Sequence, residues 1–331
     1  MKIVVAPDKF KGTVSAIGMA EGVAGALTEI GHTAIAVPLA DGGEGFLQVL
    51  GGPNRNTIVH GPLGDTVSAS WRLHHNVAVI EMAQAAGLSL VGGAEFNDPM
   101  EASTRGVGEL LVAAAEAGAR RIIVGVGGSA TTDGGLGALK AMHPTGRFRG
   151  IDIEIACDVQ TTFVEAAPVF APQKGASAAQ VKLLQRRLER LAQVYLHDTG
   201  VEVADVPGSG AAGGLAGGLL TIGAQLRSGF ELVAEELELD QVCADADLVI
   251  TGEGFLDEES FNGKVVGGVA TLCAELNVPC LAIVGEVFEP LPEQAKQITT
   301  LSLMEKFGED RSFNDPVGCA AELAVNYVRN L

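Results

Sequence analysis

The chain has 331 residues; 47% are hydrophobic, only 5% are aromatic, and 44 are glycine. This length predicts two domains, and the small, aromatic-poor composition favours close-packed α/β layers over an all-β sandwich. The formal charge of −19 excludes nucleic acid and anionic membranes as ready partners, so an anionic substrate has to be held locally.

The cysteines and the chain start indicate an intracellular protein. The five cysteines form no C-x-x-C pair, and the six histidines show no zinc spacing, which is typical of buried thiols. The N-terminal "MKIVVAPDKF" is too short and polar for a signal peptide. The apolar stretch 211–226 is too glycine-rich to span a bilayer and predicts a buried helix. We expect a cytoplasmic protein with no membrane partner.

Short β-branched runs that end in Gly or Asp recur along the chain, with helical patterns between several of them. This alternation predicts a mainly parallel sheet with helices on both faces. The predicted strands cover 2–8, 34–43, 76–83, 121–129, 152–158, 247–254, 280–286 and 300–305. The predicted helices cover 13–31, 105–118, 177–199, 217–239, 263–277 and 316–330.

Residues 57–83 break this rhythm, because they read as three strands separated by turns, an antiparallel pattern. We interpret the break as the entry into a second, inserted domain. The prediction is one domain from residues 1–56 plus 230–331 and an inserted α/β domain from residues 57–229.

Polar side chains follow the predicted strands, where ligands of open α/β sheets bind. The motifs are "APDKFKGT" (6–13), "DGGEG" (41–45), "GGSATTDGG" (127–135), "PQKGA" (172–176), "GSGAAGGLAGG" (208–218), "TGEGFLD" (251–257) and "NGK" (262–264). Each motif alone is also explained as a tight turn, Ser129 or Asp133 as a helix cap, and each lysine as a solvated surface group.

The segment "DGGEG" raises a conflict, since glycine-rich loops let backbone N–H groups approach an anion whereas carboxylates repel one. A divalent cation between carboxylates and phosphates resolves it. Phosphoryl transfer needs this mixture of carboxylates, N–H cradles and lysines. No P-loop or protein-kinase signature is present, and the G-x-G-x-x-G at 208–213 is weak because Pro207 interrupts the strand that a dinucleotide fold needs.

These motifs, in this order along nearly the whole chain, resemble the type I glycerate kinases, which are ATP-dependent enzymes. The resemblance extends to "GKVVGGVA" (263–270) and "FGEDRSFNDPVGCAAELA" (307–324). It implies a discontinuous flavodoxin-like (Rossmann-like) domain, an inserted α/β domain, and an active site in the cleft between them. It also implies transfer of the γ-phosphate of ATP to a glycerate hydroxyl, with 2-phosphoglycerate the usual bacterial product.

The resemblance assigns conserved acids to Asp8, Asp41, Glu44, Asp133, Glu253 and Asp257, and conserved lysines to Lys11, Lys174 and Lys264. We expect Asp41, Asp133, Lys11 and Lys264 to be catalytic, with Asp41 or Asp133 the general base. We expect Glu44, Glu253 and Asp257 to bind Mg²⁺. Substrate or phosphate contacts are expected at Asp8, Lys9, Gly42, Gly43, Gly127, Gly128, Ser129, Thr131, Lys174, Gly210, Gly213 and Gly214.

The chain departs from the family pattern at Lys9, where Ser is usual, at Thr132, where Asn is usual, and at Glu259, where Gln is usual. The loop 160–170 is shorter than usual and lacks glycine. Two alternatives to a glycerate kinase stay open: an NAD(P)-dependent oxidoreductase and a non-catalytic paralogue that binds nucleotides or anions. The sequence leaves the phosphorylated hydroxyl, the identity of the base and the oligomeric state undecided.

Overall fold

The computed structural model describes residues 1–10 and 12–331. It divides into two compact units, unit 1 with Met1–Asp41 and Ser228–Leu331, and unit 2 with Gly42–Arg227. The sequence predicted that the boundaries between the two domains follow residue 56 and precede residue 230. The structure groups residues 42–56 with unit 2, where the backbone N–H of Leu47 donates to Glu81 at 2.7 Å.

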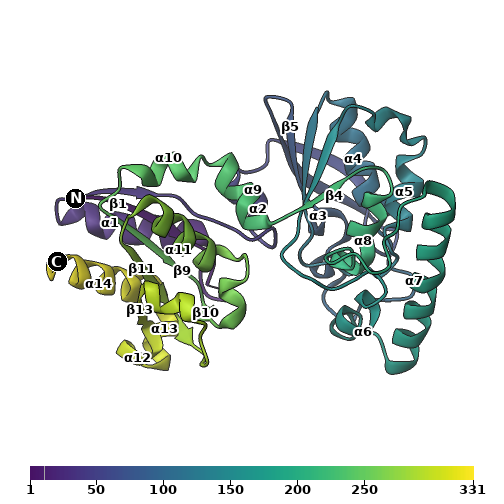
Figure 1. The fold of residues 1–331 in the computed structure, drawn as a ribbon. Coiled ribbons are helices and arrows are strands. Elements are labelled where there is room, and N and C mark those ends of the chain that lie inside the picture. The colour runs from purple at the N-terminus through teal and green to yellow at the C-terminus, as the bar shows by residue number, and fades with distance from the viewer. Residues whose placement is uncertain (11) are drawn as a thin grey trace. The chain divides into compact units, whose positions relative to one another are not determined.

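Unit 1 contains a five-stranded parallel sheet in the order β13-β11-β9-β1-β2 (Figure 1). Counted along the chain within this sheet, the order is 2-1-3-4-5, the flavodoxin-like order. The predicted α/β fold class is confirmed, and each predicted strand of this unit is present. The strands are β1 (Lys2–Pro7), β2 (Thr33–Ala36), β9 (Leu248–Gly252), β11 (Cys280–Val284) and β13 (Thr299–Ser302).

Helices cover both faces of this sheet, as the doubly apolar strands predict. The helices α1 (Ala16–Glu29) and α14 (Pro316–Arg329) share one buried cluster with β1, β9 and β11, and α11 (Val265–Leu276) packs with the other face of β11. The shorter elements are α9 (Gly229–Glu236), α10 (Leu239–Ala244), β10 (Phe255–Leu256), η4 (Glu258–Phe261), β12 (Glu286–Val287), η5 (Glu293–Gln297), α12 (Leu303–Phe307) and α13 (Glu309–Asn314).

Unit 2 contains a six-stranded mixed sheet in the order β3-β4-β5-β6-β7-β8. The first three strands are antiparallel, which confirms the pattern predicted at 57–83, and β5 to β8 are parallel. The strands are β3 (Arg55–His60), β4 (Thr66–His74), β5 (Val77–Glu81), β6 (Arg121–Gly125), β7 (Asp152–Ala156) and β8 (Gln225–Arg227).

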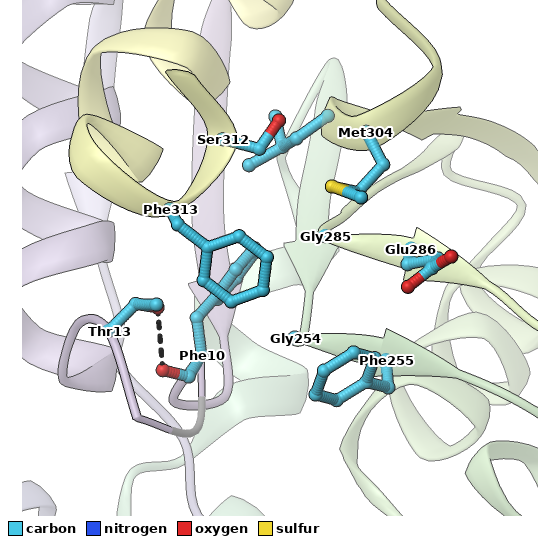
Figure 2. A pocket seen from close by; sticks show the side chains of 10 residues that line it. Phe10, Thr13, Gly254, Phe255, Gly285, Glu286, Met304, Ser312 and Phe313 are labelled. Atoms are coloured by element: carbon cyan, nitrogen blue, oxygen red, sulfur yellow. Dashed lines mark hydrogen bonds between the residues drawn. The ribbon is translucent and has the colours of Figure 1, made fainter. Parts of the chain in front are cut away.

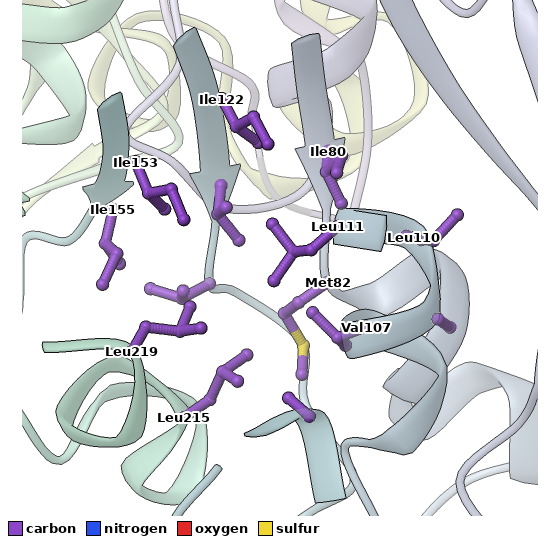
Figure 3. Close-up of a cluster of buried hydrophobic side chains, with 14 of the residues drawn as sticks. Ile80, Met82, Val107, Leu110, Leu111, Ile122, Ile153, Ile155, Leu215 and Leu219 are labelled. Atoms are coloured by element: carbon purple, nitrogen blue, oxygen red, sulfur yellow. The ribbon is translucent and has the colours of Figure 1, made fainter. Parts of the chain in front are cut away.

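The core of unit 2 lies where strand side chains such as Ile80 and Ile122 meet Leu110 of α4 and Leu215 of α8 (Figure 3). The helices are α2 (Phe46–Val49), α3 (Ala83–Ala86), α4 (Arg105–Glu116), α5 (Leu136–Met142), α6 (Ala166–Phe170), α7 (Ala178–Thr199) and α8 (Ala211–Leu220). Short 3-10 turns are η1 (Leu88–Val91), η2 (Thr145–Phe148) and η3 (Pro172–Lys174).

The prediction of one helix over 217–239 is wrong. The chain leaves α8 at Leu220, adopts a left-handed conformation at Gly223 (φ +92°), adds β8 to the edge of the sheet beside β7, and starts α9 at Gly229. The left-handed glycine ends the helix, and pairing with β7 then outweighs the helical pattern of the residues that follow. None of the helices in the described ranges 1–10 and 12–331 is long and apolar enough to cross a bilayer.

Candidate active site

Acidic side chains gather at the carboxyl end of the unit 1 sheet. Asp8 and Glu253 follow the neighbouring strands β1 and β9, whose register pairs Pro7 with Gly252. Lys9 Nζ lies 3.3 Å from Asp41 Oδ1 and 3.7 Å from Asp8 Oδ1. We call Asp8, Lys9, Asp41 and Glu253 the acid cluster; it brings together three segments that are far apart in the sequence.

Burial disfavours the ionised form of two carboxyl groups in the acid cluster, those of Asp8 and Glu253. Desolvation raises the pKa of Asp8 to about 6, with Lys9 opposing the rise and Asp41 adding to it. Desolvation likewise raises the pKa of Glu253 to about 7, and nearby Asp8 adds to the rise. Neighbouring buried carboxylates ionise together only when a cation compensates their charge, so the cluster is a place where a bound cation is stabilised.

The donor set fits a hard divalent cation such as Mg²⁺. Glu253 Oε1 is buried and accepts no hydrogen bond from the described part of the chain. Within residues 1–10 and 12–331, no three His, Cys, Asp or Glu side chains are grouped tightly enough to hold a metal by themselves. Mg²⁺ bound with a nucleotide needs only one or two carboxylates, because phosphate and water oxygens complete its shell. Asp8 and Glu253 can supply those two.

Asp257 and Lys264 lie on the loop that follows Glu253. Asp257 Oδ1 accepts hydrogen bonds from the backbone N–H and the hydroxyl of Ser260, so this carboxylate caps η4. Lys264 Nζ donates to Glu259 Oε2 at 3.2 Å. Burial acts to lower the pKa of Lys264, but Glu259 and the other nearby carboxylates outweigh it, and the pKa is raised. The unusual Glu259 thus holds the lysine in its charged form. Lys11, the other predicted catalytic lysine, lies outside the described residues.

Asp133 ties together two helix starts in unit 2. Its Oδ2 accepts hydrogen bonds from the backbone N–H of Thr104 (2.9 Å) and of Gly137 (3.1 Å), and from the Thr104 hydroxyl (2.9 Å). Its Oδ1 accepts from Gly135 N–H at 3.1 Å. The capping role left open by the sequence is therefore present. The carboxylate also borders a cavity of about 460 Å³ with Arg105 and Lys140, two cations suited to an anionic ligand.

The glycines of 208–218 let two loops pack directly against each other. Gly213 has φ +67°, and a Cβ there would lie 2.0 Å from Thr131 O. A Cβ on Gly214 (φ +88°) would lie 2.9 Å from Gly134 Cα, and the Gly134 N–H donates to Gly213 O at 3.0 Å. A Cβ on Gly210 would meet backbone oxygens of the 160–170 loop. These buried glycines have a packing role, and no strand precedes them, so the context of a dinucleotide fold is missing.

The loop 42–45 lies against the ends of β6 and β7 in the same close manner. Gly42 has φ +90°, and a Cβ there would lie 2.8 Å from Ala156 O. A Cβ on Gly127 would lie 2.6 Å from Gly43 Cα. Gly128 is exposed and left-handed, Ser129 bridges to Gly87, and Glu44 is exposed. The exposed part of this edge is therefore centred on Glu44 and Gly128.

Lys174 supports the 127–135 loop from inside. Its Nζ is buried and donates to Thr131 O at 2.6 Å, and desolvation lowers its pKa to about 7. Asn97 donates to both Ala130 O and Lys174 O, at 3.0 and 2.8 Å. A lysine adjoining glycine had indicated a phosphate contact, whereas the geometry shows a loop-supporting side chain.

Sequence reasoning missed Glu81 and Thr104. Glu81 Oε1 accepts the Leu47 N–H that starts α2, and burial raises the pKa of Glu81. An acid at the end of the buried run "NVAVIEMA" was the available signal. Thr104 donates to Asp133 and accepts from Ala138 N–H at 3.0 Å, contacts over distances that no local pattern encodes.

The structure thus brings together two groups of predicted residues. Asp8, Lys9, Asp41 and Glu253 share unit 1, while Ser129, Thr131, Asp133 and Lys174 share unit 2. Asp41 and Asp133 belong to different units, so their meeting in one site stays a prediction.

Comparison with known proteins matches the same family that the sequence motifs resemble. A model described as the glycerate kinase family matches residues 3–146 and 142–326. The chain is 40% identical to glycerate 2-kinase of Escherichia coli K12, over 87% of this chain and 86% of the relative. It is 38% identical to glycerate kinase of Bacillus subtilis 168, over 87% and 85%.

A solved structure shows the same fold. The crystal structure of a provisionally assigned glycerate kinase 2 from Salmonella typhimurium LT2 has a TM-score of 0.83 and 34% identity, covering 100% of this chain and 99% of that one. The family match covers both units and nearly every residue, so this chain belongs to the glycerate kinase family.

Proposed function

We propose that this chain transfers the γ-phosphate of ATP to the 2-hydroxyl of glycerate and releases 2-phosphoglycerate and ADP. The observation that carries the proposal is the match to the glycerate kinase family along both units, with a glycerate 2-kinase among the relatives at 40% identity. The acid cluster and the two loop systems supply the chemistry that such a transfer needs.

The acid cluster is the end of the site that receives the nucleotide phosphates. Asp8 and Glu253 would hold Mg²⁺, which supplies charge neutralisation for the phosphate oxygens when it is bound. Lys264, kept charged by Glu259, is suited to stabilise the charge that spreads over the transferred group. Lys11, adjoining Gly12 in the same motif as Asp8, keeps its assigned role as a second cation for that charge.

We assign the general base to Asp41 rather than Asp133. Both oxygens of Asp133 already accept hydrogen bonds, three of them from backbone N–H groups that start or precede helices. The Asp41 side chain is 28% exposed, so an acceptor hydroxyl can approach it and transfer its proton to it. Asp133 then acts as a positioning residue, which shapes a cavity of unit 2 together with Arg105 and Lys140.

The test is product analysis on the full chain. ³¹P NMR of a mixture of protein, MgATP and D-glycerate is expected to show ADP and 2-phosphoglycerate in equal amounts. Formation of 3-phosphoglycerate would overturn the choice of hydroxyl. Nucleotide binding by calorimetry without any transfer would overturn the activity and leave a non-catalytic binding protein.

Two matched variants test the choice of base. Asp41→Asn should lower kcat by about 10²–10⁴-fold with little change in the unfolding midpoint. Asp133→Asn should lower the unfolding midpoint, because the new amide cannot accept all the N–H bonds that the carboxylate accepts. The reverse pattern would return the base to Asp133.

A further inference from the structure

A buried carboxyl group at the end of β5 supports the loop 42–45. Ile80 and Met82, its neighbours in the chain, point into the core of unit 2 (Figure 3). Successive side chains of a strand alternate between the two faces of a sheet, so Glu81 lies on the opposite face. Only 9% of Glu81 is exposed there. A carboxylate in such a place needs hydrogen-bond donors, because burial without them disfavours its charge.

The donors come largely from the segment 45–47. The backbone N–H of Leu47 donates to Glu81 Oε1 at 2.7 Å. Burial raises the pKa of Glu81, and the nearby Glu44 adds to the rise, whereas hydrogen bonds from Leu47, from the Gln84 side chain and from the Gly45 N–H oppose it. Three donors therefore converge on one carboxylate, and two of them are backbone groups of the segment 45–47.

The segment 41–45 is attached to unit 2 at two places. The close glycine contacts hold residues 42 and 43 against the ends of β6 and β7. Glu81 holds residues 45 and 47. The exposed Glu44 lies between the two attachments, and Asp41, the proposed base, immediately precedes the first of them. Both acids are thus carried by a segment whose second attachment is a single buried side chain.

The loops at the carboxyl end of the unit 1 sheet are supported by apolar contacts instead. Phe10, which follows β1, lies with Phe255 and Met304 around a pocket (Figure 2). Only about 30 Å³ of this pocket is accessible, which is room for water and not for a larger ligand. Hydrogen bonds to a charged group are shorter and stronger than neutral ones, so the contact that Glu81 makes fixes a position more closely than apolar packing does.

We propose that Glu81 is a positioning residue for the phosphoryl transfer, which holds the segment 41–45 so that Asp41 is placed to accept the proton of the acceptor hydroxyl. This inference rests on the proposed function. A misplacement of about 1 Å in a reacting group lowers a rate by up to about a hundredfold. The loss should appear in kcat and not in the KM for MgATP, because Asp8 and Glu253, the proposed metal ligands, lie outside this segment.

Glu81→Gln tests the role with little change in shape. A glutamine keeps one acceptor oxygen and has a donor in place of the other, so it cannot accept from all three donors. We expect kcat to fall by about ten- to hundredfold, the KM for MgATP to stay within about threefold, and amide hydrogen exchange of the segment 42–50 to become about tenfold faster.

Glu154→Gln is the matched control. Glu154 lies in β7 of the same sheet with a side chain that is 13% exposed, but it bonds to Arg121 and Arg227. This variant should change neither kcat nor the exchange of the segment 42–50. Equal losses of kcat in the two variants would overturn the specific role of Glu81.

A double variant tests whether Glu81 acts through Asp41. With Asp41→Asn the base is already absent, so adding Glu81→Gln should lower kcat further by about twofold at most. Multiplied losses, a wild-type kcat in Glu81→Gln, or unchanged exchange of the segment 42–50 would each overturn the positioning role. If the wild-type chain does not phosphorylate glycerate, the proposed function fails, and the exchange measurement alone decides whether Glu81 holds the segment.

Discussion

Replacing the buried lysine of unit 2, Lys174→Met, should change how stability depends on pH. Desolvation lowers the pKa of Lys174 from 10.5 to about 7. Between these values the unfolded chain binds one more proton than the folded chain, so the free energy of unfolding rises with pH and is lowest below pH 7. At 1.36 kcal/mol per pKa unit, this lowering of the Lys174 pKa corresponds to a penalty of about 5 kcal/mol for burying the charged lysine.

Methionine removes that penalty but also the hydrogen bond to Thr131 O, whose loss costs about 1–3 kcal/mol. The variant should therefore be more stable than the wild type by about 2–4 kcal/mol at pH 6, and this gain should shrink by about 1.4 kcal/mol per pH unit from pH 7 to 9. Trp71, the only tryptophan of the chain, is buried in β4 of unit 2, so its fluorescence reports the unfolding of that unit in urea.

The difference between the two proteins isolates Lys174, because every other titrating group is common to both. Parallel curves of unfolding free energy against pH for wild type and variant would refute the argument. They would mean that the Lys174 ammonium is hydrated or paired in solution and titrates at its ordinary pKa.

Three further changes test the packing and the charges. Gly213→Ala should lower the free energy of unfolding by about 2–3 kcal/mol more than Gly200→Ala does. Both glycines are left-handed, but only at Gly213 would a Cβ lie 2.0 Å from a backbone oxygen. Equal losses of unfolding free energy, measured by Trp71 fluorescence, would contradict this. Glu81→Ala should destabilise unit 2 by about 1–3 kcal/mol, since it leaves the buried N–H at the start of α2 unpaired, and Glu81→Gln should lose less. Lys9→Ser should tighten Mn²⁺ binding, followed by electron paramagnetic resonance, by at least about tenfold, because a neighbouring positive charge is removed; weaker binding would show that Lys9 does not oppose the metal.

Local patterns predicted the elements of the sheets well but not their order. Buried β-branched runs marked β1, β9 and β11, because strands covered on both faces are apolar throughout. The neighbouring positions of β1 and β9 come from pairing between residues about 245 apart, which no local pattern encodes. The helix predicted over 217–239 was wrong for a related reason: β8 exists only because β7 is there to pair with it.

The candidate site was predictable as residue types and less so as roles. Carboxylates at strand ends indicated a cation site, and Asp8 and Glu253 do follow the adjacent strands β1 and β9. The role of Asp133 depends on Thr104, 29 residues away, and the burial of Lys174 depends on the loop that covers it. A lysine beside a glycine looks the same in the sequence whether it faces solvent or supports a loop from within.

The most direct test of the central claim is to locate the cation. In crystals of the full chain grown with Mn²⁺ and ADP, anomalous scattering should place Mn²⁺ bonded to both the nucleotide phosphates and Glu253 Oε1, the buried oxygen that otherwise accepts no hydrogen bond in the described chain. A Mn²⁺ ion bound to the phosphates with neither Glu253 nor Asp8 among its ligands would contradict the account.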